Sequence, residues 1–355
     1  MRFPEFSGEW DEYAIGEILS IGNGRDYKHL HNGDIPVFGT GGYMTSVDDF
    51  LYDGESVFVG RKGTINKPLY YNGKFWTVDT LFYTYNFTDV LPKFVYCLFQ
   101  TINWLKYNEA SGVPSLSKAT IEKIKVRIPS MDEQDKLSNL LFLLDKRIEV
   151  QNKIIEDWKK LKSAIVEELY SATKGETYSF RQLLEVVNEK NRKLEYTNVL
   201  SASQELGMIK RSDINIDIKF EQDSICGYKI VRNGDYVVHL RSFQGGFAFS
   251  DKTGICSPAY TILRPNDLVV YGYLSHFFTS RLFIKSLKLV TYGIRDGRSI
   301  NVDEWLNMTV ILPTIQEQLH IIEIINSISS KLYNETRICD SLLRQKSYLL
   351  KAMFI

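Results

Sequence analysis

Charge of one sign is missing from this sequence, since its 355 residues include 43 basic and 43 acidic side chains. No global field therefore attracts a polyanion, and contact with nucleic acid would need local basic patches or partner proteins. No apolar run reaches the roughly eighteen residues of a membrane-spanning helix. The first residues, Met1 to Phe6, lack the apolar core of a signal peptide. We therefore expect a soluble, cytoplasmic protein.

Motifs for catalysis and metal binding are missing as well. The sequence has neither a P-loop nor the Asn/Asp-Pro-Pro-aromatic motif of methyltransferases. Its five histidines show no metal-ligand spacing with carboxylates, and its four cysteines are too irregularly spaced for a zinc ribbon or a disulfide framework. Asp157-Trp158-Lys159 resembles half of a nuclease motif, but Trp158 falls on the apolar face of a predicted helix. We expect no catalytic residue, no metal site and no cofactor in this chain.

What the sequence does contain is an internal repeat. Ile128-Pro129-Ser130, soon followed by Glu133-Gln134, reappears as Leu312-Pro313-Thr314, soon followed by Glu317-Gln318. Each copy precedes a heptad pattern of about forty residues. The offset in residue number that relates Ile128 to Leu312 also superposes the apolar positions of the two heptad patterns. We call these apolar positions the helix seam. The predicted seam consists of Leu137, Leu141, Leu144, Ile148, Ile155, Trp158, Ile165 and Leu169 in the first helix, and Ile321, Ile325, Ile328, Leu332, Leu342 and Leu349 in the second.

Polar interruptions of the seam also repeat, at Gln151 with Glu335 and at Lys162 with Lys346. The chain is too long for a single core. We predict an α+β fold in which two similar globular α/β domains are separated by two long antiparallel coiled-coil helices, with a pseudo-twofold internal repeat. A shorter helix is predicted from Pro92 to Tyr107. The predicted boundaries are 1–130 for the first domain, 131–174 for the central helix, 175–314 for the second domain and 315–355 for the C-terminal helix.

A glycine turn carries the most suggestive cations. Gly60-Arg61-Lys62-Gly63-Thr64 follows a predicted buried strand, and arginine is the side chain best shaped to bind a guanine edge with two hydrogen bonds. The equivalent turn of the second half, 241–246, keeps the arginine as Arg241 and adds Gln244, a side chain suited to adenine. Charged turns of this kind are often only solvated. Their recurrence favours contact with DNA.

Two further pairs of segments are candidates for the same role. Gly39-Thr40-Gly41-Gly42-Tyr43 lacks the lysine and spacing of a P-loop and is a recognition loop or a plain turn. The segment 111–118 corresponds to 292–299, and both are polar loops before a final strand, for which a solvated loop is the alternative. The residues predicted to contact DNA are Thr40, Gly41, Gly42, Tyr43, Arg61, Lys62, Thr64, Asn66, Lys67, Ser115, Lys118, Arg241, Ser242, Gln244, Arg295 and Arg298.

The order of these features resembles a known family. Pro-Glu-Phe-Ser-Gly-Glu-Trp at 4–10, Gly60-Arg61-Lys62-Gly63, Trp76-Thr77-Val78-Asp79-Thr80, Ile128-Pro129 before Glu133-Gln134, and the segment 200–209 are similar to motifs of the specificity (S) subunit, HsdS, of type I restriction-modification systems. The resemblance implies two target recognition domains, 1–130 and 175–314. Each would read one half of a split target in double-stranded DNA. The long helices would act as a ruler between them.

Partners follow from the same resemblance. It implies that the helices bind two methylation (M) subunits, which carry S-adenosylmethionine and methylate adenine, and that restriction (R) subunits supply translocation and cleavage with ATP and Mg. Apolar positions off the seam are consistent with such a contact or with a wider intramolecular face. They are Leu140, Phe142, Leu143 and Ile154 in the first helix, and Ile322, Ile324 and Ile338 in the second.

Two other interpretations stay open at this point. The chain could be the specificity module of another restriction class, in which methylation and cleavage reside on a separate polypeptide. It could also be a coiled-coil adaptor without DNA, whose two β-rich heads bind protein or glycan.

Overall fold

The computed structural model describes residues 1–203, 206–213, 222–239, 246–292 and 299–354. It divides into two compact units. The first unit comprises Met1–Lys153 with Thr336–Ile355, and the second comprises Ile154–Glu335. Two long helices, α4 (Met131–Ser171) and α9 (Ile315–Met353), each contribute to both units. Among the described residues, no helix has the length and apolar character needed to cross a membrane.

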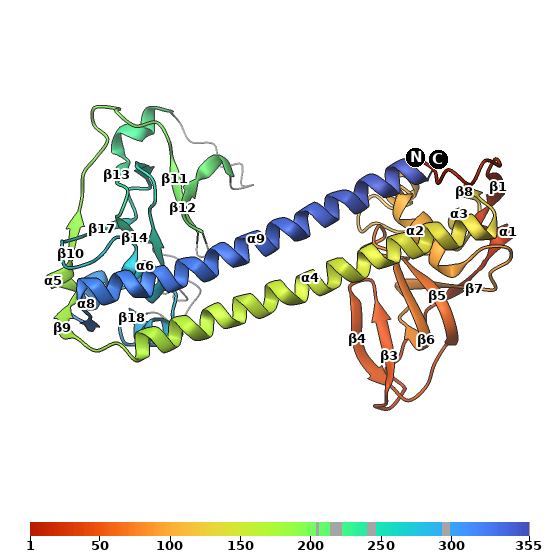
Figure 1. The fold of residues 1–355 in the computed structure, drawn as a ribbon, viewed down its shortest axis with the longest axis horizontal. Coiled ribbons are helices and arrows are strands. Elements are labelled where there is room, and N and C mark those ends of the chain that lie inside the picture. Colours follow the sequence, from red (N-terminus) through yellow and green to blue (C-terminus); the bar gives the residue numbers. More distant parts are fainter. Residues whose placement is uncertain (204–205, 214–221, 240–245, 293–298, 355) are drawn as a thin grey trace. The chain divides into compact units, whose positions relative to one another are not determined.

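The first unit is built on a six-stranded sheet with the order β2-β7-β5-β6-β3-β4 (Figure 1). Its neighbours pair antiparallel except β3 and β6, which run parallel. A separate antiparallel pair joins β1 to β8. The strands are β1 (Asp11–Ala14), β2 (Ser20–Asn23), β3 (Ile35–Gly39), β4 (Gly42–Val47), β5 (Tyr52–Gly60), β6 (Leu69–Thr77), β7 (Leu81–Tyr85) and β8 (Lys125–Ile128). The shorter helices are α1 (Ile15–Ile18), α2 (Pro92–Thr101), the 3₁₀ helix η1 (Trp104–Tyr107) and α3 (Lys118–Glu122).

Helix α2 covers one face of this sheet. It begins at Pro92, whose ring fixes the backbone angle that the first helical turn needs. Phe94, Leu98 and Phe99 on its inner face are buried against β5, β7 and α3 in the main core of the unit. The opposite face of the sheet has its own cluster of aromatic side chains, centred on Phe58 and Phe75 with ring centroids 4.7 Å apart. The sheet is therefore packed on both faces.

The prediction of one helix from Pro92 to Tyr107 is wrong, because the chain leaves the α-helix at Thr101 and forms η1. The reason is the indole of Trp104, which is buried in the core. Its Nε1 donates a hydrogen bond of 2.8 Å to the carbonyl of Phe99. This bond satisfies a carbonyl that the end of α2 leaves without a helical partner.

The second unit repeats the framework with shorter strands. Its central sheet has the order β10-β17-β14-β15, and four antiparallel pairs surround it: β9 with β20, β11 with β12, β13 with β16, and β18 with β19. The strands are β9 (Glu176–Ser179), β10 (Leu184–Val187), β11 (Leu200–Ser203), β12 (Gly207–Lys210), β13 (Lys229–Val231), β14 (Tyr236–Val238), β15 (Phe247–Phe249), β16 (Gly254–Cys256), β17 (Thr261–Pro265), β18 (Thr291–Tyr292), β19 (Ser299–Ile300) and β20 (Thr309–Leu312). The helices are α5 (Phe180–Leu183), η2 (Arg211–Asp213), η3 (Gln222–Gly227), α6 (Tyr273–Phe277), α7 (Arg281–Ser286), η4 (Leu287–Leu289) and α8 (Val302–Leu306).

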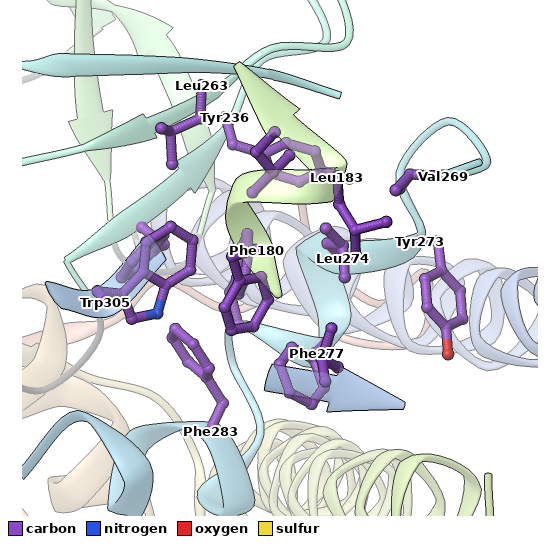
Figure 2. Close-up of a cluster of buried hydrophobic side chains, with 14 of the residues drawn as sticks. Phe180, Leu183, Tyr236, Leu263, Val269, Tyr273, Leu274, Phe277, Phe283 and Trp305 are labelled. Carbon is purple, nitrogen blue, oxygen red and sulfur yellow. The ribbon is translucent and has the colours of Figure 1, made fainter. Parts of the chain in front are cut away.

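Aromatic rings dominate the core of the second unit. Figure 2 shows Phe180 of α5 beside Trp305 of α8, with Phe283 of α7 close to both. The rings of Phe180 and Trp305 stack with centroids 4.4 Å apart and an interplanar angle of 18°. Phe247 of β15 lies 4.7 Å from Trp305. Residues from α5, α7, α8 and the sheet thus converge on one buried indole.

The two units share an order of elements as well as an architecture. In each, a strand, a one-turn helix and a second strand follow one another, as β1-α1-β2 and as β9-α5-β10. The first strand of each set pairs with the strand that precedes a long helix, β8 or β20. A backbone bond repeats as well, from the N–H of Ile15 to the carbonyl of Ile124 and from that of Phe180 to Met308. The predicted internal repeat is therefore present in the fold.

A buried glutamine at the start of each long helix repeats with the same hydrogen bonds. Gln134 accepts from the N–H of Leu91 at 2.8 Å and donates to the carbonyls of Asp89 and Pro129 at 3.1 and 2.9 Å. Gln318 accepts from Val270 at 2.8 Å and donates to the carbonyls of Leu268 and Pro313 at 2.9 and 3.0 Å. Each side chain ties the start of a long helix to the loop that precedes α2 or α6. The glutamine of the repeated Glu-Gln dipeptide thus has the same structural role in both units.

Replacing Gln318 with leucine should destabilise the second unit. The change leaves the N–H of Val270 and two carbonyls without a partner, and an unsatisfied buried polar group costs about 1–3 kcal/mol. Chemical denaturation should show a loss of that size in the free energy of unfolding. Gln316→Leu is a matched control, because Gln316 is exposed on the same turn of α9. Equal stability of the two variants would contradict the role assigned to Gln318.

Within each unit the long helices pack antiparallel. In the first unit, Lys346 of α9 forms an ion pair with Asp145 of α4, and the thiol of Cys339 donates to Asn152 at 3.3 Å. In the second unit, Val166 of α4 and Ile325 of α9 are buried in one core. All residues of the predicted seam are buried or half-buried. The polar interruptions are accommodated as well, since Gln151 and Glu335 are buried and Lys162 and Lys346 are half-buried.

Apolar residues off the seam fall into two groups. Phe142 packs intramolecularly, with its ring 4.9 Å from that of Tyr70, and Ile322 packs on the core of the second unit. Ile324 is half-buried. Leu140, Leu143, Ile154 and Ile338 are exposed, and Leu143 is the most exposed of them at 67%. Of the seven off-seam residues named in the sequence analysis, this second group leaves apolar side chains exposed to solvent.

Candidate nucleic-acid interface

Three loops of the first unit converge at one end of the six-stranded sheet, and we call them the loop cluster. They are 40–43, which comprises the turn after β3 and the first two residues of β4, 61–67 between β5 and β6, and 111–118, which ends at the first residue of α3. Their placement follows from sheet register. Strand β5 ends at Gly60 opposite Leu81, the first residue of β7, so the segment after Gly60 emerges beside the turn at Thr80.

The glycine turn is held by backbone hydrogen bonds. The N–H groups of Arg61 and Lys62 both donate to the carbonyl of Thr80, at 2.8 and 3.2 Å. Gly63 donates to Pro114 at 2.8 Å, and Leu116 donates to the carbonyl of Arg61 at 2.9 Å. The loops 61–67 and 111–118 therefore run together as a short antiparallel pair, with Lys62 opposite Ser115.

Two glycines are required for this turn. A Cβ on Gly60 would lie 2.2 Å from the carbonyl oxygen of Thr64, which no side chain can accommodate. Gly63 has a φ of +87°, in the left-handed region that favours glycine. Ile65, 1% exposed, anchors the far side of the loop in the main core. The turn is thus rigid at its base, whereas the Arg61 and Lys62 side chains are exposed.

Arg61 is partly oriented by its surroundings. Its guanidinium carbon lies 6.0 Å from the centroid of the Phe82 ring, and Nη1 donates to the carbonyl of Asp79 at 3.4 Å. These contacts use one face and one donor of the guanidinium. An exposed arginine held in this way retains donors for a base edge or a phosphate.

The loop 111–118 is closed by two polar side chains that precede it. Asn108 Oδ1 accepts from the N–H groups of Ala110 and Ser115, at 3.1 and 2.9 Å. Hydrogen bonds from the hydroxyls of Thr120 and then Ser117 hold the pKa of the Glu109 carboxyl below its ordinary value. Ser117 also caps α3 by accepting from the N–H of Thr120 at 3.1 Å. The loop that carries Ser115 and Lys118 is therefore tied at both ends.

The remaining predicted residues of the first unit lie in or beside this cluster. An ideal Cβ on Gly63 would lie 3.8 Å from Thr40 Oγ1, which places the first loop next to the glycine turn. Tyr43 is 64% exposed, with its hydroxyl 3.1 Å from Ser46 Oγ. Gly41, Asn66 and Lys67 are exposed, Gly42 and Thr64 are half-buried, and exposed Lys118 forms an ion pair of 3.6 Å with Glu122.

Arg25 lies beside the loop cluster and is not among the residues that the sequence predicts to contact DNA. It follows the end of β2, which pairs with the start of β7 and so ends beside the glycine turn. Its N–H donates to Thr77 at 2.8 Å, and its carbonyl accepts from Trp76 Nε1 at 2.9 Å. Its side chain is exposed. The signal was a Gly-Arg dipeptide at a strand end, Gly24-Arg25, as at Gly60-Arg61.

In the second unit, the structure describes the strands that flank the candidate loops, whereas the predicted contact residues of those loops lie outside the described residues. Strands β14 and β15 form a hairpin that His239 closes by donating its N–H to the carbonyl of Gly246 at 2.8 Å. Burial lowers the pKa of the His239 imidazole. Strands β18 and β19 pair across the other candidate loop. The predicted residues Arg241, Ser242, Gln244, Arg295 and Arg298 lie outside the described residues.

The fold and these loops define a protein of two repeated α+β units with polar and cationic loops at a sheet end. Residues 7–159 match the family model of the type I restriction modification DNA specificity domain. A putative type I restriction enzyme specificity subunit of Haemophilus influenzae is 20% identical over 83% of this chain and 80% of its own length. The type I restriction enzyme MjaVIII specificity subunit of Methanocaldococcus jannaschii is 23% identical over 79% of this chain and 71% of its own.

A solved structure shares the fold along its whole length. The type I restriction-modification system S subunit from M. genitalium aligns with a TM-score of 0.63 at 13% identity, covering 100% of this chain and 99% of that one. The chain is therefore similar in sequence to specificity subunits of type I restriction-modification systems, and it shares the fold of one such subunit.

Proposed function

We propose that this chain binds double-stranded DNA and recognises a two-part target, one half through the loops of each unit. The observation that carries the proposal is the glycine turn of the first unit, where Arg61 and Lys62 are exposed on a rigid base beside Thr40 and Ser115. Arginine and lysine at a fixed backbone suit base edges and phosphates. The repeat of the frame in the second unit supports a second half-site.

The chemistry in this proposal resides on partner subunits. Recognition by this chain would direct adenine methylation by two M subunits that carry S-adenosylmethionine, and restriction by R subunits that use ATP and Mg. The exposed apolar side chains Leu140, Leu143, Ile154 and Ile338 support a partner contact along the long helices. A chain with no net charge also needs such help, because partner subunits would supply further phosphate contacts.

The length of the long helices should set the spacing between the two half-sites. Removing one heptad, 149–155 from α4 together with the facing 336–342 from α9, shortens each helix by about 10 Å. That length equals about three base-pair steps. We expect the recognised spacer to shorten by about three base pairs, and insertion of a heptad at the same place to lengthen it equally.

The measurement is sequencing of methylated DNA from cells that express the variant with its M subunit. Such sequencing reads both half-sites and the spacer at once. Unchanged half-sites with an altered spacer are the expected result. A variant that still methylates with the original spacer would rule out a ruler role for the helices. Loss of all methylation would be followed by direct binding to duplexes with shortened spacers, which the proposal requires to succeed.

A further inference from the structure

Strand β8 of the first unit has an open edge. Among the described residues it pairs with β1 only. The hydrogen bond from the N–H of Ile15 to the carbonyl of Ile124 shows which residues of the β8 segment direct their backbone groups toward β1. In an antiparallel pair, backbone groups point alternately toward and away from the partner strand. The N–H and C=O groups of Lys125 and Arg127 therefore point away from β1.

A cavity of about 420 Å³ lies along this strand. Its walls come from β8, from the end of α2 with η1, and from Phe354, which follows α9. Ile102, Tyr107 and Phe354 contribute apolar surface. The cavity thus offers apolar walls beside free backbone donors and acceptors, the combination that accepts an added peptide strand.

The charge of this cavity is positive. Lys106, Lys125 and Arg127 line it together with one carboxylate, Glu12. Glu12 accepts from Lys125 Nζ at 2.8 Å and lies directly across the strand pair from Arg127. Among the described residues Lys106 forms no ion pair. Among the lining residues three cations therefore face one carboxylate, and Glu17 outside the lining also acts on Lys125. The cationic excess of the lining favours an acidic occupant.

A buried donor at the cavity also lacks an acceptor. Trp10 lines the cavity, and its ring packs against Phe94 and Phe354 with centroids 6.1 and 6.0 Å away. Its Nε1 is buried without a hydrogen-bond partner among the described residues. A buried donor left unpaired costs free energy, and this one belongs to a residue that lines the cavity.

The second unit lacks these charges at the equivalent strand. Thr309 and Ile311 of β20 occupy the places of Lys125 and Arg127. Strand β20 therefore presents no cation along its length, since its other residues are Val310 and Leu312. The cationic strand edge therefore occurs on β8 but not on the equivalent strand β20.

We propose that the β8 edge docks an extended acidic segment of another polypeptide, which adds to β8 as a strand, with one such site per chain. Carboxylates of the segment pair with Lys106 and Arg127, its backbone bonds to the free edge, and its apolar side chains fill the cavity. The proposal is independent of the DNA target. A nucleic-acid strand is less suited, because the apolar walls and free backbone groups match a peptide.

The test uses the purified full-length chain and a fluorescein-labelled peptide of about ten residues with alternating glutamate and isoleucine. Fluorescence polarisation should show binding, and titration calorimetry should give one site per chain. A peptide with lysine in place of glutamate should bind at least about tenfold more weakly. So should a peptide N-methylated at alternate residues, because it cannot donate to the β8 edge. Failure of the acidic peptide to bind, or equal binding by the lysine or N-methylated peptide, overturns the proposal.

Variants of the chain distinguish the contribution of ion pairs to peptide binding from that of backbone hydrogen bonds. Lys106→Gln with Arg127→Gln should weaken the acidic peptide by about tenfold, whereas Lys159→Gln with Lys160→Gln, at exposed positions of α4, should not. Lys125→Pro should bind more weakly than Lys125→Ala, since proline removes the outward N–H at the first residue of the strand. Circular dichroism checks that each variant is folded. If duplex DNA displaces the peptide from the unmodified chain, and the double glutamine variant loses DNA binding there, the surface is a nucleic-acid contact and the proposal is wrong.

Discussion

Trp305→Ala should destabilise the second unit more than any other single substitution considered above. The indole is fully buried and touches rings from α5, α7 and β15. Among the described residues its Nε1 makes no hydrogen bond, so the change removes packing alone. Truncating a buried tryptophan to alanine costs about 3–5 kcal/mol. Differential scanning calorimetry should show a melting transition lowered by about 6–20 °C.

A matched control for this result is Leu289→Ala. Leu289 belongs to the same unit but is 75% exposed, so its loss leaves no cavity. Its melting transition should stay within about 2 °C of the unmodified chain. Trp305→Phe, which keeps an aromatic ring against Phe180, should fall between the two. A Trp305→Ala variant as stable as the control would mean that the core is not centred on this indole.

Arg61→Ala with Lys62→Ala should cause the largest loss of DNA affinity. Each good contact to a base is worth about 1–3 kcal/mol, so affinity for the target should fall by about 5- to 150-fold. The slope of affinity against salt should also decrease by about one for each phosphate contact removed. Fluorescence anisotropy with the chain, assembled with the proposed M subunits, and a target duplex, over a series of salt concentrations, measures both quantities.

The single variants distinguish the two roles. If Arg61 binds a base edge, Arg61→Ala relaxes specificity at one position of the first half-site. If Lys62 binds phosphate, Lys62→Ala weakens all sequences alike. Lys159→Ala with Lys160→Ala, two neighbouring exposed cations on α4, is the control of equal charge change and should leave the affinity nearly unchanged. An equal loss in this control would assign the effect to net charge and not to the glycine turn.

The candidate site could be predicted in part. The glycines around Arg61 were a usable signal, because a turn with a left-handed residue needs them locally. Arg25 was not found, because it is far from Arg61 in sequence and reaches the same surface only through the pairing of β2 and β5 with β7. The role of Asn108 and Glu109 in closing the next loop was also invisible, since their partners are hydroxyl and amide groups of an irregular segment.

The sequence by itself determined the duplication, the two long helices and the positions of their seam, because these depend on periodicity and on residues close along the chain. Only the tertiary structure decided that Gln134 and Gln318 tie each long helix to its unit, that Trp104 ends α2 early, and that Lys106 and Arg127 share one cavity. These features depend on contacts between segments distant in the chain. Strand register and core packing bring such segments together, and the local sequence pattern does not indicate which distant segments will make contact.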